Sequence, residues 1–471
     1  MSQIAFIVLE LARFLFRVLI LIFCGQMLRA TARALQGVAP RKEVLRESWP
    51  EVRVRLQTRY PDENLRRLLR TVRDLDYPEQ SLKIELWISA SDKTDVHKDE
   101  VLQSLGDDGV EIQWGPCTAP KAEVPPTEEF VVILDGNSQP HPRFLKHALG
   151  AFSNTEVGVV RAPWLLTNRD NNILARLQGI LHDAFRVIEQ PQISLEALPS
   201  PLGGTPEVWR RACLEEVVEA GEPSTADNWR HLLRVSLTHW RVVNLSTNEA
   251  TKELPETMWE FRQQQREICS KSLGHLATLL PTLRTRPGVW RQKSALITYL
   301  GRHWVYPLIL VTCLTSPLAT FYEMPFLIHY GLIANAALLT FVLSSILVYF
   351  GVAIWKSRTR ISNILLIPTF LPLAAGMSLT YSVGIIEGLW SIWRSSADEP
   401  KPAPEHTEGS RFDWTAYVEI AVALYHASAL YLSLTTGHIG ESLFFLLVSL
   451  GFGWVGIASL YSGSQSKEAL K

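Results

Sequence analysis

The sequence predicts an α/β domain with a mostly parallel sheet, together with an α-helical transmembrane region. Two observations support this prediction. Between residues 50 and 271, short strand-like segments alternate with segments of helical periodicity, the pattern of a parallel sheet covered by helices. After residue 303, five long apolar stretches follow one another, and about 20 such residues cross a bilayer as a helix. A chain of 471 residues is also long for a single domain.

The strands and helices of the α/β region differ in their hydrophobic period. Residues 51–58 (EVRVRLQT) alternate apolar and polar side chains, as a half-buried strand does, whereas residues 63–75 (ENLRRLLRTVRDL) repeat apolar residues at helical spacing. Residues 76–81 (DYPEQS) contain the proline of a turn. The further predicted strands are 81–90, 110–115 and 130–136, and the further predicted helix is 142–152.

The apolar stretches of the last third are too many and too close together for soluble buried helices. Residues such as Pro317 and Pro368 would break soluble helices but are tolerated inside membrane bundles. One stretch, 364–393, is long enough to hold an interfacial piece followed by a span. The five stretches are 305–322, 328–355, 364–393, 414–434 and 443–461.

Residues 4–30 are also apolar, but they carry Glu10, Arg13 and Arg17 on one helical face. Each arginine near the bilayer centre costs roughly 2.5 to 3.5 kcal/mol on insertion scales. The helix therefore either spans the membrane with its charged face turned into the bundle, or lies in the interface. The segment has no small-residue cleavage site, so we expect a membrane anchor over residues 1–30 and not a removed signal peptide.

The basic residues predict which side of the membrane the α/β domain occupies. Five of them lie between residues 284 and 302 and three between 356 and 360, while the EMPF connection between the first two stretches has none. Because basic loops stay on the cytoplasmic side, a multi-pass protein with its α/β domain in the cytoplasm is expected. The expected boundaries are an anchor at 1–30, the α/β domain at 50–271, a basic interfacial segment at 272–302 and transmembrane helices at 303–463.

The net charge, the cysteine spacing and the missing loop motifs argue against several classes of function. A net charge of −1 gives no reason to expect a nucleic-acid partner. The 5 cysteines are scattered, without the spacing of a zinc site or a disulfide framework. Neither a G-x-G-x-x-G loop nor a G-K-[ST] loop occurs in the sequence, so neither a dinucleotide site nor a P-loop is indicated.

Carboxylates follow two of the predicted strands. Asp92 comes after one strand, with Asp95 close behind, and Asp135 ends another. Open α/β sheets bind ligands beyond the carboxyl ends of their strands. Asp135 with Asn137 could therefore hold a divalent cation and a phosphate, or the two could belong to a plain turn.

The order and separation of these carboxylates, together with later motifs, resemble glycosyltransferase family 2. The similarity is to the membrane-bound branch that includes cellulose, chitin and hyaluronan synthases and ceramide glucosyltransferase-like enzymes, and it covers roughly Val52 to Lys271. It implies a GT-A-like fold and inverting transfer of a sugar, expected to be UDP-linked, to a membrane-associated lipid or glycan acceptor. It also implies Mg²⁺ or Mn²⁺ as the cofactor.

Three segments resemble the nucleotide-sugar site of the family. ISASDKTD is similar to the acidic loop that holds the base and the ribose, which points to Asp92 and less directly to Asp95. PKAE contains Lys121 and resembles the lysine segment before the D-x-D strand. LDGN takes the place of D-x-D, so Asp135 and Asn137 are the expected ligands of the metal ion.

Three later segments resemble the acceptor and catalytic motifs. GGTPEVWRR is similar to the Gly-rich acceptor loop and contributes Gly203 and Gly204. TAD is similar to T-E-D, which makes Asp227 the expected catalytic base, although the same residue could serve as a helix N-cap. QQQRE is similar to Q-x-x-R-W and assigns Gln263 and Arg266 to the diphosphate; alternatively, Arg266 is a basic residue of an interfacial helix.

Three positions depart from the family pattern. Asn137 is neutral where the family has a second carboxylate, Ala226 replaces the glutamate beside the base, and Glu267 replaces the tryptophan of Q-x-x-R-W. The loss of that aromatic face removes a sugar-stacking platform, which favours a single addition over polymer synthesis. Two alternatives stay open: a catalytically weakened or inactive partner subunit of a polysaccharide or envelope complex, and a processive polysaccharide synthase.

Overall fold

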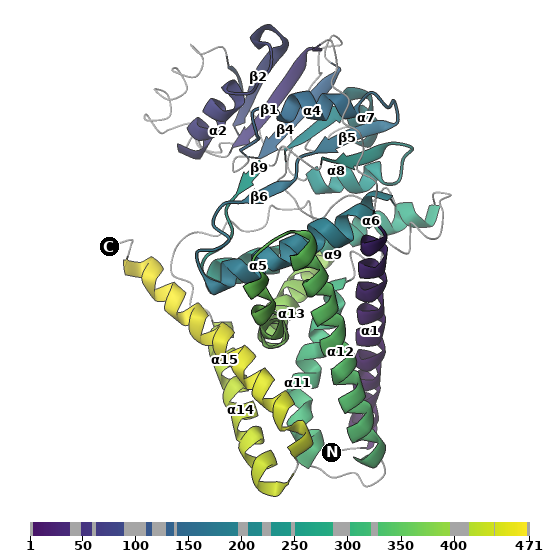
Figure 1. The fold of residues 1–471 in the computed structure, drawn as a ribbon, viewed down its shortest axis with the longest axis vertical. Coiled ribbons are helices and arrows are strands. Elements are labelled where there is room, and N and C mark those ends of the chain that lie inside the picture. Colours follow the sequence, from purple (N-terminus) through teal and green to yellow (C-terminus); the bar gives the residue numbers. More distant parts are fainter. Residues whose placement is uncertain are drawn as a thin grey trace. The chain divides into compact units, whose positions relative to one another are not determined.

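The chain divides into two compact units (Figure 1). The α/β unit comprises Gly37–Asn168 and Gln190–Leu254, and the helical unit comprises Met1–Gln36, Arg169–Glu189 and Pro255–Lys471. The computed structural model describes residues 3–37, 49–58, 63–88, 110–114, 129–135, 139–195, 206–218, 228–245, 250–285, 302–321, 328–395, 414–437 and 439–468.

A seven-stranded sheet forms the α/β unit, in the order β3-β2-β1-β4-β7-β5-β8. Strands β3, β2, β1 and β4 are parallel neighbours, β7 is antiparallel to both β4 and β5, and β8 is parallel to β5. This arrangement confirms the predicted mostly parallel sheet. The bounds are β1 (Val52–Thr58), β2 (Leu82–Ile88), β3 (Glu111–Trp114), β4 (Phe130–Asp135), β5 (Val157–Arg161), β7 (Glu207–Arg210) and β8 (Arg241–Asn244), with β6 (Trp164–Leu166) and β9 (Ala250–Lys252) forming a separate parallel pair.

Helices cover both faces of the sheet. Because successive side chains of a strand point to opposite faces, alternate residues of each strand pack against the helices on each face. On one face, Val54 of β1 shares a core with α2 and α4. On the other face, Val131 and Ile133 of β4 share a core with α7 and α8. The four strands and two helices predicted in this region all occur at their expected positions. The helix bounds are α2 (Glu63–Arg73), α4 (Phe144–Ala151), α6 (Gln190–Leu195), α7 (Arg211–Val217) and α8 (Asn228–Val235).

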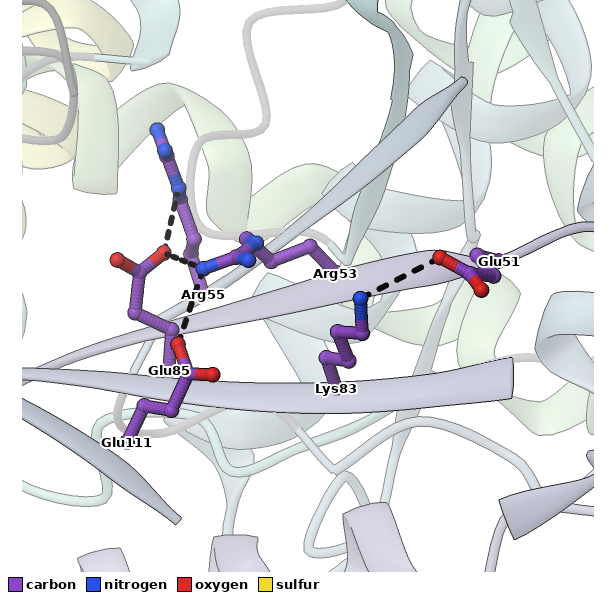
Figure 2. A network of polar contacts seen from close by, with 6 residues as sticks. All are labelled: Glu51, Arg53, Arg55, Lys83, Glu85 and Glu111. Atoms are coloured by element: carbon purple, nitrogen blue, oxygen red, sulfur yellow. Dashed lines mark hydrogen bonds and ion pairs between the residues drawn. The ribbon is translucent and has the colours of Figure 1, made fainter. Parts of the chain in front are cut away.

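A charged network lies on the second face of β1 and β2 (Figure 2). Arg53 and Arg55 alternate with the apolar core residues of β1, so they lie on the opposite face. Glu85 of β2 is 1% exposed, and its Oε2 lies 3.0 Å from Arg55 Nε and 3.6 Å from Arg53 Nη1. Arg53 Nη1 also lies 3.2 Å from Glu111 Oε2 of β3. One buried carboxylate is therefore shared by two guanidinium groups.

The helical unit contains long apolar helices, and α1 packs against both α11 and α12 (Figure 1). The third predicted apolar stretch divides into a 3₁₀ segment, η4, followed by α13, in agreement with the predicted short piece and span. The bounds are α1 (Gln3–Gln36), α5 (Ile173–Ala184), the π-helix η2 (Phe185–Glu189), α9 (Met258–Thr285), α11 (Val305–Phe321), α12 (Ile328–Lys356), η4 (Ile361–Thr369), α13 (Phe370–Ser395), α14 (Trp414–Thr436) and α15 (Ile439–Glu468).

Five helical segments within the described part of the chain are long and apolar enough to cross a membrane. Helix α11 contributes only the shorter apolar segment Val305–Leu318. The chain is therefore a membrane protein, and one of these five segments lies near its N-terminus. The five segments are Phe14–Gln36, Ala337–Lys356, Ile361–Trp393, Trp414–Thr436 and Ile439–Ser462.

Glycines bring the backbones of α13 and α15 together. A Cβ atom at Gly376 would collide with Gly451 O, and a Cβ atom at Gly451 would collide with Pro372 O. Small residues at such contacts let membrane helices approach closely enough for van der Waals packing and interhelical hydrogen bonds. Helix α13 is therefore held against α15 along its N-terminal half.

The charged network of β1 and β2 makes a stability prediction. Glu85→Gln removes the anion but keeps the shape, so the buried Arg55 guanidinium loses its pairing with Glu85 while Arg53 keeps Glu111, and we expect a loss of about 3 to 5 kcal/mol of unfolding free energy. Hydrogen exchange of the β1 and β2 amides in the detergent-solubilised full chain measures this loss.

The matched control for Glu85→Gln is Glu51→Gln. Glu51 pairs with Lys83 at 3.3 Å, and both side chains are exposed, so its loss should cost about 0 to 1 kcal/mol. Equal effects of the two substitutions would show that burial adds nothing to the network.

Candidate functional site

The carboxyl ends of β1, β2, β3 and β4 meet at one edge of the sheet. The register pairs Asp135, the last residue of β4, with Gln57, and it pairs Thr58 with Ile88 of β2. Trp114, the last residue of β3, pairs with Ile88 in turn. Asp135 therefore ends a central strand at the edge where open α/β sheets bind ligands, as the sequence predicted.

Strand β7 begins at this same edge because it runs antiparallel to β4. Its first residue, Glu207, pairs with Ile133 of β4 and with Arg161, the last residue of β5. Arg161 also pairs with Asn244, the last residue of β8. The edge that ends at Asp135 thus continues across the second half of the sheet.

Two buried ion pairs lie in one row across the sheet, on either side of Ile133. Ile133 is two residues before Asp135, so the row lies one pleat below the edge. The first pair is the Arg55–Glu85 contact, and the second joins Arg161 and Glu207. From β2 to β8 the row runs Glu85, Arg55, Ile133, Glu207, Arg161, Asn244.

The Arg161–Glu207 pair is almost completely enclosed. Arg161 Nε lies 3.0 Å from Glu207 Oε1, and each side chain is 1% exposed. Trp209 Nε1 donates to the other carboxylate oxygen at 3.0 Å. Burial raises the pKa of Glu207, and the charge of Arg161 and the Trp209 N–H counteract part of that rise. The pair holds β5 and β7 together at the edge.

Sequence reasoning singled out the glycines before Glu207 and missed the glutamate itself. Arg161 and Glu207 are 46 residues apart, and only the pairing of β5 with β7 brings them together. No local pattern in the sequence signals such a contact.

Several predicted site residues lie outside the described residues, and for Asp135 the structure gives the backbone position only. Within the described ranges, no group of three or more His, Cys, Asp or Glu side chains could hold a metal ion. The predicted donors Asp135 and Asn137 offer a carboxylate and an amide oxygen, the oxygen chemistry that Mg²⁺ and Mn²⁺ prefer. The assignments outside the described residues stay predictions: Asp92, Asp95, Lys121, Asn137, Gly203, Gly204 and Asp227.

The remaining predicted residues, Gln263 and Arg266, lie on α9 of the helical unit, and both are half-buried. Arg266 contacts Glu387 of α13 with two nitrogen atoms: Nε lies 2.5 Å from Oε2, and Nη2 contacts Oε1. The hydroxyl of Tyr381 on α13 donates a hydrogen bond to Gln265 Oε1 at 3.0 Å. The guanidinium of Arg266 is therefore oriented by a carboxylate of α13.

Glu387 is a further residue that sequence reasoning missed. A signal for it existed, because Glu387 is the one acidic residue in the apolar stretch 364–393. An ionisable residue in such a stretch is costly and commonly has a partner or a function.

The chain is similar to plant glycan-synthesising enzymes over part of its length. It is 26% identical over 196 residues to glucomannan 4-beta-mannosyltransferase 1 of Oryza sativa subsp. japonica, which is 41% of this chain and 36% of that protein. It is 27% identical over 185 residues to glucomannan 4-beta-mannosyltransferase 2 of Arabidopsis thaliana, which is 38% of this chain and 35% of that protein. The match spans about a third of the length of each relative.

A solved structure shares the fold. The mannosyltransferase PcManGT from Pyrobaculum calidifontis, in complex with GDP-Man and Mn²⁺, superimposes with a TM-score of 0.52 at 16% identity, covering 81% of this chain and 99% of that chain. No protein-family model matches the sequence. The predicted fold class, a GT-A-like α/β domain with transmembrane helices, is confirmed by this likeness and by the apolar helices.

The Arg161–Glu207 pair predicts a pH-dependent stability. In Arg161→Met the buried Glu207 loses its cation, and its folded-state pKa rises further above the unfolded value of about 4.3. The unfolded chain then loses this proton at lower pH than the folded chain does. The contribution of protonated Glu207 to the free energy of unfolding is therefore fully present below about pH 4, and it is lost as pH rises through the folded-state pKa of Glu207.

Hydrogen exchange of the β5 and β7 amides of Arg161→Met at pH 5.5 and pH 8, corrected for intrinsic exchange, measures this dependence. The matched control is Arg161→Met combined with Glu207→Gln, which cannot titrate at this position. The same pH dependence in both variants would contradict the assignment to Glu207.

Proposed function

We propose that this protein is a membrane-bound inverting glycosyltransferase of the family 2 type, which transfers a mannosyl residue from a nucleotide sugar to a membrane-associated lipid or glycan acceptor. The observation that carries the proposal is the similarity to two plant glucomannan mannosyltransferases in a chain with a GT-A-like sheet. Asp135 supports it, because this residue ends the central strand at the edge where open α/β sheets bind ligands.

The relatives favour a mannosyl donor over the UDP-linked sugar that the family resemblance alone suggested. Both plant relatives are named as mannosyltransferases, and the solved structure of similar fold holds GDP-Man. GDP-mannose is therefore the proposed donor, and UDP-sugars are the alternative.

The proposed reaction is an in-line displacement at the anomeric carbon. The acceptor hydroxyl oxygen forms the new bond to that carbon, and the bond from the carbon to the diphosphate oxygen breaks. Asp227 accepts the hydroxyl proton, as a general base within hydrogen-bond reach must. Gly203 and Gly204 belong to the acceptor side, while Asp92 and Lys121 belong to the nucleotide side.

The diphosphate requires positive charge and hydrogen-bond donors. Asp135 and Asn137 would hold Mg²⁺ or Mn²⁺, which when bound neutralises charge on the leaving diphosphate. A guanidinium has five N–H donors in a planar fork. Glu387 takes two nitrogen atoms of Arg266, and the remaining donors suit phosphate oxygens, with Gln263 alongside.

Glu267, which replaces the family tryptophan, is exposed and forms an ion pair with Lys271 at 2.7 Å. Its charge is thus partly balanced within α9, which is compatible with a diphosphate site on the same helix. The absence of an aromatic ring at this position supports a single addition. A ladder of long products would instead support a processive synthase.

The basic residues around the first two C-terminal apolar stretches support a cytoplasmic active site. A nucleotide sugar would then reach the α/β domain from the cytoplasm. Two departures from the family pattern support the alternative of an inactive partner subunit: Asn137 is neutral where the family has a second carboxylate, and Ala226 replaces the glutamate beside the base.

The central test is a transfer assay with the purified full chain, membrane lipids and oligosaccharide acceptors, a panel of GDP- and UDP-sugars, and Mn²⁺. We expect a product heavier by one hexose with GDP-mannose. Asp227→Asn should lower kcat by about 100- to 10,000-fold, because it removes the general base. The control is Asp74→Asn, which changes an exposed carboxylate after α2. Absence of transfer from every donor would leave the inactive-subunit alternative.

The metal site makes a second functional prediction. Asn137→Asp restores a second carboxylate, so the Mn²⁺ concentration for half-maximal transfer should fall several-fold, whereas Asp135→Asn should raise it. Titration of Mn²⁺ into the chelator-treated enzyme measures both shifts. An unchanged Mn²⁺ requirement in both variants would remove these residues from the metal site.

A further inference from the structure

Helix α9 carries a buried arginine, Arg262, beside the predicted diphosphate ligands Gln263 and Arg266. Arg262 is 5% exposed and lies on the same helix face as Cys269, which is also buried. Arginine is almost never fully buried without a partner. Gln263 follows Arg262 directly and therefore points about 100° away around the helix axis, so the packing of Arg262 decides the direction of Gln263.

One guanidinium group connects α9 to three other helices. Arg262 Nε donates to Thr380 Oγ1 of α13 at 2.9 Å, and Nη1 donates to Ser459 Oγ of α15 at 2.8 Å. Nη2 donates to Thr415 of α14 and forms an ion pair with Glu419 Oε1 of α14 at 3.1 Å. Glu419 is 0% exposed, so this is a buried ion pair ringed by hydroxyl groups.

Two glycines of α13 bring α9 close without determining its rotation. A Cβ atom at Gly384 would lie 2.8 Å from Arg266 O, and one at Gly388 would lie 2.9 Å from Ser270 O. Glycines four residues apart form a flat surface for close helix packing. A flat surface restricts distance more than rotation, so a directional contact is needed to fix how α9 turns about its axis.

We propose that Arg262 and Glu419 form a positioning pair, which fixes the rotation of α9 within the helical unit and so sets the direction of Gln263 and Arg266, the residues of α9 that the proposed function assigns to the diphosphate. This inference rests on the proposed function. Replacing a buried ion pair by apolar residues is often neutral or stabilising, so stability alone gives no reason for it, whereas fixing a unique register is its best-supported use. The half-exposed Arg266–Glu387 pair orients the Arg266 side chain, but exposed pairs contribute little free energy to holding a whole helix in one rotation.

The decisive variant is Arg262→Met combined with Glu419→Leu, which removes both charges and keeps similar volumes. We expect a melting temperature close to that of the wild type, a 10- to 100-fold lower kcat/KM for the nucleotide sugar, and an unchanged KM for the acceptor. Arg262→Lys keeps the charge but loses the planar fork, so its kcat/KM should be intermediate. Glu419→Gln leaves a buried arginine without its counter-charge and should lower the melting temperature.

The control is Ser433→Ala combined with Ser442→Ala, which removes a buried contact of 3.0 Å between α14 and α15 away from α9. It should leave kcat/KM for the nucleotide sugar unchanged. Two outcomes for Arg262→Met combined with Glu419→Leu would overturn the positioning role while the proposed function stands. One is wild-type kinetics, and the other is a lower melting temperature with an unchanged KM for the nucleotide sugar. A wild-type chain that neither binds nor transfers any nucleotide sugar would overturn both.

Discussion

The burial of β4 on both faces is the constraint on which the α/β unit depends. Every residue from Phe130 to Leu134 is buried, with alternate side chains entering the two separate cores of the sheet. A strand in this position cannot slip by one residue without exchanging those two sets of side chains. Its carboxyl end is therefore fixed, and Asp135 ends it beside the start of β7 and the end of β1.

Buried ion pairs recur around the predicted chemistry. Arg55–Glu85 and Arg161–Glu207 lie on either side of β4 below the sheet edge, and Arg262–Glu419 lies beneath α9 in the helical unit. The desolvation of such charges opposes folding, so each pair is acceptable only with close geometry and additional hydrogen bonds. All three pairs meet the distance condition. Each ion pair also joins strands or helices in one fixed arrangement, and a fixed arrangement is what a catalytic site would require.

Helix α13 organises the helical unit. Its glycines approach the backbones of α9 and α15, its Thr380 accepts a hydrogen bond from Arg262, and its Glu387 orients Arg266. Polar groups in apolar helices are costly when unpaired, so these contacts also determine which helix faces meet. Helix α13 thereby positions residues of α9 and does more than anchor the chain.

The sequence by itself located four of the seven strands of the sheet, the helices α2 and α4, and the long apolar helices, because strand alternation, helical periodicity and long apolar runs are local properties. It located β4 and the residue that ends it, and it allowed a short piece and a span within 364–393, which the structure shows as η4 and α13. Only the tertiary structure decided the partners of the buried charges. Arg161 and Glu207 meet because β5 pairs with β7, and Arg262 meets Glu419 because α9 packs among α13, α14 and α15. Strand order and helix packing depend on contacts between distant segments, which no local pattern encodes.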